Sequence, residues 1–72
     1  MNPAVRQELL RVLGDLGEQA PDVRFGQLLA NLSYMAKDFT AEAIWDVEDE
    51  ELLEAARGHL QELSERHARA AS

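Results

Sequence analysis

The sequence predicts a small all-α protein that folds as a three-helix bundle in a single domain covering residues 1–72. Three observations predict this fold. Apolar residues recur at helical spacing in three separate segments. Glycine and proline interrupt the pattern between the first two segments, and no segment has the apolar–polar alternation of a half-buried strand. A chain of 72 residues buries only about 60% of its unfolded surface, so we expect a thin core.

The first helix is expected over residues 3–16. Asn2 is a good N-cap, and Pro3 suits the first helical position because its missing N–H would have no partner there. Gly17 is the expected C-terminal stop, and Pro21 ends any helix by residue 20. The apolar stripe of this helix consists of Val5, Leu9, Val12, Leu13 and Leu16.

The second helix is expected over residues 24–37, with Asp22 as its N-cap. It has no charged residue from Phe25 to Ala36, although the protein is strongly acidic. Its predicted core face carries Phe25, Leu28, Leu29, Leu32, Met35 and Ala36. The opposite face lacks the Lys and Glu of an ordinary solvated face. This opposite face consists of Gly26, Gln27, Ala30, Ser33 and Tyr34.

Two arrangements explain this uncharged second face. The helix is either sandwiched between the other two helices or forms an interface with a second chain. Gly26 and Ala30 are four residues apart, so another backbone can approach the helix closely at this point. The other two helices have charged outer faces, and this contrast favours an interface. We therefore predict a homodimer formed through the second helix.

The third helix is expected over residues 48–69, and residues 70–72 are expected to fray. Acidic residues crowd its first turn and basic residues come later, which complements the helix dipole. The connector before it is expected to contain a short helical turn near 41–45. Phe39 and Trp45 in this connector either close the open end of the bundle or are exposed anchors for a partner. The apolar stripe of the helix consists of Leu52, Leu53, Ala56, Leu60 and Leu63.

The net charge of −7 lies entirely in the second half of the chain. Residues 1–37 hold four acids and four bases, whereas residues 38–72 hold ten acids and three bases. Such a chain repels nucleic-acid backbones and anionic membranes, so we expect neither as a partner. An alternative function is that of an acidic inhibitor that mimics nucleic acid and binds a basic protein. Its acids would be Asp38, Glu42, Asp46, Glu48, Asp49, Glu50, Glu51 and Glu54.

The sequence predicts no catalytic, cofactor or metal site. It has no cysteine, and its two histidines, His59 and His67, do not form a His-x-x-x-His pair. An EF-hand loop that began at Asp46 would need Gly and Glu where Glu51 and Arg57 stand. Phosphate-loop and nucleophile-elbow motifs are also missing. We expect no enzyme, no cofactor and no small-molecule substrate.

Two sequence patterns resemble those of a group of short, uncharacterised bacterial and phage-associated helical proteins. The first pattern is Pro-x-x-Arg-x-Gly-Gln-Leu, formed here by Pro21, Arg24, Gly26, Gln27 and Leu28. The second is Glu-Asp-x-x-Leu-Leu, formed here by Glu48, Asp49, Leu52 and Leu53. The resemblance implies a natural helical family of bacterial type and no particular activity.

Arg24 lies at the expected start of the second helix, where a positive charge is unfavourable relative to the helix dipole. We expect a compensating ion pair with Glu48 or Asp49, which would join the starts of the second and third helices. No apolar run is long enough to span a bilayer, and the first residues lack a signal-peptide pattern. The sequence thus predicts a cytoplasmic, non-catalytic interaction module.

Overall fold

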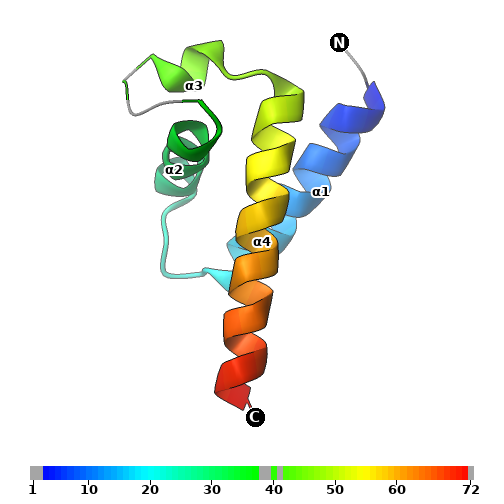
Figure 1. The fold of residues 1–72 in the computed structure, drawn as a ribbon, viewed down its shortest axis with the longest axis vertical. Coiled ribbons are helices and arrows are strands. Elements are labelled where there is room, and N and C mark those ends of the chain that lie inside the picture. The colour runs from blue at the N-terminus through cyan, green and yellow to red at the C-terminus, as the bar shows by residue number, and fades with distance from the viewer. Residues whose placement is uncertain (1–2, 38–39, 41, 72) are drawn as a thin grey trace.

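The computed structural model describes residues 3–37, 40 and 42–71, and these residues form an all-α bundle (Figure 1). The bundle contains α1 (Pro3–Gln19), α2 (Phe25–Ala36), α3 (Ala43–Asp46) and α4 (Asp49–Ala71). No strand occurs in the part of the chain that the structure describes. The predicted fold class is confirmed, and α3 is the short helical turn expected near 41–45.

Helix α4 occupies the centre of the bundle, with α1 and α2 packed on different sides of it and α3 packed on α2. Helices α1 and α4 run in the same direction. Arg6 near the start of α1 pairs with Asp49 at the start of α4, and Gln19 at the end of α1 reaches Ser64. Helix α2 is seen almost along its axis in Figure 1, so it crosses α4 steeply. The alternative in which the second helix is sandwiched between the other two is therefore wrong, because α4 takes the central position.

The core joins the apolar stripes of α1, α2 and α4. The stripes predicted for the first and third helices both face this core. The buried residues of the cluster are Leu9, Val12, Leu13, Leu16, Leu28, Leu32, Leu53 and Ala56. The partly buried residues packed against them are Val5, Leu29, Leu52, Leu60 and Leu63.

Two residues predicted as core lie largely outside it. Phe25 is 52% exposed and Met35 is 53% exposed. They stand at the first residue and in the last turn of α2. Because α2 is short and crosses α4 steeply, only its middle turns, at Leu28 and Leu32, bury large apolar side chains in the core.

Helix α1 is longer than predicted and ends at Gln19 rather than at residue 16. Gly17 does not stop the helix, because the Ala20 N–H donates to the Leu16 carbonyl oxygen at 2.9 Å and completes another turn. The chain then turns before α2, where the Val23 N–H donates to the Ala20 carbonyl oxygen at 3.1 Å.

The N-cap of α2 is Arg24, whose backbone is extended at φ −62° and ψ 141°. No side chain caps this end of the helix, so the expected role of Asp22 as N-cap is wrong. Helix α4 ends at Ala71, so residues 70 and 71 of the expected frayed tail are helical. Alanine is the best helix former, which favours this extension.

The start of α4 is held by its own acidic turn. The Glu48 N–H donates to Glu51 Oε1 at 3.0 Å, which satisfies a backbone donor that no helical carbonyl reaches. Carboxylates in this first turn also interact favourably with the positive end of the helix dipole. The acidic run thus stabilises a helix start, as its position predicts.

Candidate functional site

The outer side of α2 carries no charge along the length of the helix. Gly26 and Gln27 are exposed, and Ala30 and Tyr34 are half-buried, so these four predicted interface residues have accessible surface. Asn31 is also exposed, and the sequence analysis assigned it to neither face of the helix. We call this surface the α2 face, and it consists of Gly26, Gln27, Ala30, Asn31 and Tyr34.

Ser33 does not belong to the α2 face, and its predicted place there is wrong. It is 1% exposed, and its Oγ donates to the Leu29 carbonyl oxygen at 2.9 Å. A serine hydroxyl that bonds the carbonyl four residues earlier is satisfied without water, so it can be buried. On the α2 face itself, Gln27 Nε2 donates to Asn31 Oδ1 at 2.9 Å.

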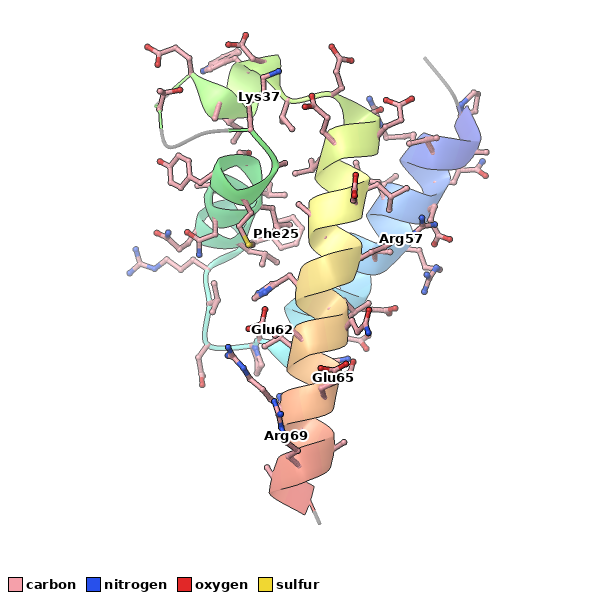
Figure 2. All side chains as sticks on the ribbon, viewed as in Figure 1. Phe25, Lys37, Arg57, Glu62, Glu65 and Arg69 are labelled. Carbon is pink, nitrogen blue, oxygen red and sulfur yellow. The ribbon has the colours of Figure 1, made fainter. Side chains whose placement is uncertain are left out.

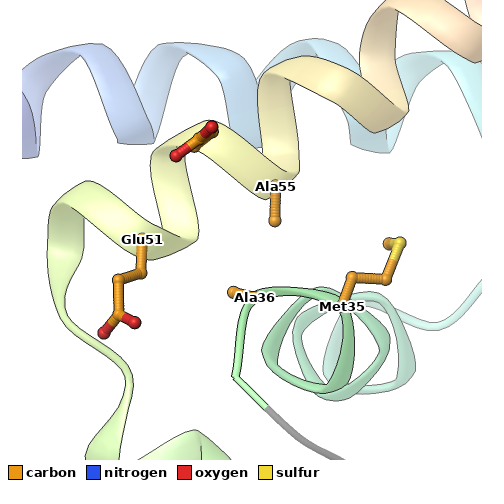
Figure 3. Close-up of a pocket in the computed structure, with 5 residues that line it drawn as sticks. Met35, Ala36, Glu51 and Ala55 are labelled. Carbon is orange, nitrogen blue, oxygen red and sulfur yellow. The ribbon is translucent and has the colours of Figure 1, made fainter.

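A hollow of about 290 Å³ lies between α2 and α4, next to the end of α2 (Figure 3). Its apolar lining comes from Met35, Ala36 and Ala55, and its carboxylates come from Glu51 and Glu54. Lys37 Nζ lies 3.8 Å from Glu51 Oε1, a long and exposed ion pair. None of the ion pairs between described residues includes Glu54.

A second hollow, of about 310 Å³, is lined by Asn31, Tyr34, Met35 and His59. Met35 lines both hollows, so they adjoin each other at this side chain, between α2 and α4. We call the two adjoining hollows the α2–α4 groove. The sequence does not reveal this groove, because Met35 continues an apolar helical stripe and is therefore predicted as core. A short helix that crosses its neighbour buries only the middle of such a stripe, and the residues at its ends stay accessible.

The ion pair expected between Arg24 and the start of α4 is not formed. Asp49 instead pairs with Arg6 of α1, whose Nε and Nη2 both lie 2.9 Å from Asp49 Oδ2. None of the ion pairs between described residues joins Arg24 to Glu48 or Asp49. The Asp49 carboxylate at the start of α4 faces α1 and binds Arg6 there, because α4 lies between α1 and α2.

The predicted partner anchors lie in the connector around α3. Phe39 is outside the described residues. Trp45 is 86% exposed and therefore does not close the end of the bundle, so that interpretation is wrong for this residue. Buried Ala43 belongs to α3, which packs on α2, while Ile44 beside Trp45 is exposed. The role of Trp45 as a partner anchor stays a prediction.

On the side of α4 that faces α1, ionic contacts lie within α1 and between α1 and α4. Arg11 pairs with Glu8 and, at 3.0 Å, with Asp15, while Arg57 of α4 lies 3.4 Å from Glu8. The hydrogen bond from Arg11 lowers the pKa of the Glu8 carboxyl, desolvation opposes this shift, and Arg57 adds to it. Arg11 and Arg57 are exposed, and Glu8 and Asp15 are half-buried, so these ion pairs lie at the surface of the α1–α4 pair.

Among the described residues, no three His, Asp or Glu side chains are placed to hold a metal ion together. In the same part of the chain, no helix combines the length and apolar character needed to cross a bilayer. Comparisons with protein families, with characterised proteins and with solved structures find no match to this chain. The resemblance carried by the two sequence patterns therefore stays a prediction.

Proposed function

We propose that this protein is a non-catalytic protein–protein interaction module that forms a homodimer through the α2 face. One observation carries the proposal: the outer side of α2 is accessible and has no charged side chain between Arg24 and Lys37. Exposed Met35 adjoins this face and adds apolar surface to it. An accessible helix side without charge is typical of a surface that another protein covers.

The charge distribution favours α2 rather than α4 as the helix through which two copies associate. Two copies of a chain with net charge −7 repel each other wherever carboxylates face carboxylates. Helix α4 carries exposed Glu54, Glu62 and Glu65, two of which are labelled in Figure 2, and two α4 helices would bring these groups together. The α2 face contains no such group, so two copies approach there without this repulsion.

Sedimentation equilibrium at micromolar concentration tests the proposal. We expect the unaltered protein to be a dimer and Ala30→Glu to be a monomer, because the substitution places a carboxylate near the two-fold axis in both copies. Ala4→Glu is the matched control, since Ala4 is exposed in the first turn of α1, away from the α2 face. Circular dichroism confirms that each variant is helical. A monomeric unaltered protein, or a dimeric Ala30→Glu, contradicts the proposal.

We propose an acidic inhibitor of a basic nucleic-acid-binding protein as a second candidate function. It is favoured by the exposure of most acids between residues 42 and 54, namely Glu42, Asp46, Glu48, Glu50 and Glu54. A surface of this charge attracts the groove that normally binds phosphates. Purified basic proteins bound to labelled duplex DNA provide the test. Displacement of the DNA that weakens with added salt supports this function, and no displacement at low salt opposes it.

A further inference from the structure

We infer that the α2–α4 groove binds Arg24 of a second copy, so that two copies pair reciprocally with their α2 helices antiparallel. The inference rests on the proposed dimer and identifies the groups that fix its geometry. Three observations support it. The groove has a lining that suits an arginine side chain, and the other bases of this chain already have partners. Arg24 and the groove also lie at opposite ends of the α2 face.

The groove is lined in the way that an arginine side chain requires. Met35, Ala36 and Ala55 supply apolar surface on which the methylene groups of an arginine can lie (Figure 3). Glu54 supplies an exposed carboxylate for the guanidinium, which binds carboxylates through paired N–H groups. Glu51 already faces Lys37 at 3.8 Å, whereas none of the ion pairs between described residues includes Glu54.

The chain itself identifies Arg24 as the base that enters the groove. The other bases are engaged within their own copy: Arg69 has a partner, and ion pairs are made by Arg6, Arg11, Lys37, Arg57 and Arg66. Arg24 is exposed, and none of the ion pairs between described residues includes it. Its charge also lies at the positive end of the α2 dipole, where a carboxylate from outside is stabilising.

A two-fold axis places Arg24 against the groove in both copies at once. Helix α2 has 12 residues and is about 18 Å long, so Arg24 and the Met35–Ala36 end lie at similar distances from its middle. An axis through the middle of the α2 face brings the start of one α2 to the end of the other. Each Arg24 then meets the Glu54 of its partner copy, and both grooves are filled, as an isologous interface requires.

Charge reversal and rescue test the inference by sedimentation equilibrium. Arg24→Glu is expected to weaken the dimer at least about tenfold, because two carboxylates then face each other in each groove. Arg24→Gln, which removes the charge without adding an acid, is expected to weaken it less. The double variant Arg24→Glu/Glu54→Arg restores opposite charges in both grooves, so we expect its dissociation constant to return to within about threefold of the unaltered value.

Arg69→Glu is the matched control, because it makes the same change in net charge on the last turns of α4, which extend beyond α1 (Figures 1 and 2). We expect it to leave the dissociation constant within about twofold. The inference is overturned if Arg24→Glu weakens the dimer no more than Arg69→Glu, or if the double variant dissociates as readily as Arg24→Glu. In those cases a monomeric Ala30→Glu still supports the dimer, whereas a monomeric unaltered protein ends both proposals.

Discussion

The two sides of α4 are built differently. On the α1 side, four buried apolar residues of α1 face the core, and contacts between α1 and α4 close both ends of the helix pair. On the α2 side, Leu28 and Leu32 are the large buried apolar residues of α2, and the space beyond them is the open α2–α4 groove. The ion pair across this second side is 3.8 Å long, compared with 2.9 Å between Arg6 and Asp49.

The difference separates the part of the protein that holds the fold from the part that is available to a partner. The α1–α4 pair supplies six of the eight buried residues of the core cluster, and burial of apolar surface is the main source of folding free energy. Helix α2 leaves its end residues and its outer side accessible. Because the core is thin, a second chain that covered this open apolar surface would add stability to the fold.

The largest expected effect comes from truncating the α1 side. Leu16 is fully buried, so Leu16→Ala is expected to lower the free energy of unfolding by about 3 kcal/mol. Met35→Ala is its counterpart in the α2–α4 groove and is expected to cost less than about 1 kcal/mol in the monomer, because Met35 is already half exposed. Urea unfolding at low protein concentration measures both values. Equal losses would show that the two sides of α4 are packed alike.

Much of the α1 side could be predicted from the sequence. The stripe of α1 is buried from Leu9 to Leu16, and the stripe of α4 is buried at Leu53 and Ala56 and partly buried at its other positions, as helical periodicity predicts. These helices are long and run in the same direction, so the two stripes meet over several turns. Periodicity is informative about packing when the two helices stay in contact along their length.

The α2 side was predictable in part. The uncharged character of α2 is visible in the sequence, but Ser33 turned out buried, and Phe25 and Met35 turned out exposed. Those outcomes depend on how steeply α2 crosses α4, and the crossing is set by tertiary packing rather than by the helix itself. The partner of Asp49 was missed for the same reason, because no local pattern shows that α1 and α4 begin side by side.

A smaller effect on stability is expected at Gly58, on the outer face of α4, which contacts neither α1 nor α2. A Cβ added at Gly58 would meet nothing within 4 Å, so Gly58→Ala is expected to raise the free energy of unfolding by up to about 1 kcal/mol through helix propensity alone. Gly14→Ala, in α1 with the same open surroundings, is the control and should give a similar gain. An unchanged dimer affinity in Gly58→Ala would agree with a partner seated on α2, whereas a weaker dimer would place the partner backbone against α4.

The smallest expected effect concerns the pH dependence of the ionic contacts of Glu8 on the α1 side. The hydrogen bond from Arg11, with help from Arg57, lowers the pKa of Glu8 below its ordinary value of 4.5 in the folded protein. A carboxyl whose pKa is lowered by folding stabilises the fold above its unfolded pKa, and this contribution disappears as the pH falls through the folded pKa. The denaturation midpoint of the unaltered protein should therefore decrease below pH 4.5 by more than that of Glu8→Gln, which lacks the titrating group.

The difference between the two proteins will be small, because Glu8 and both arginines are accessible to water. Met35→Ala should leave the difference intact, since Met35 lies on the other side of α4. If Glu8→Gln and the unaltered protein lose stability in parallel as the pH falls, the ionic contacts of Glu8 with Arg11 and Arg57 do not contribute to stability.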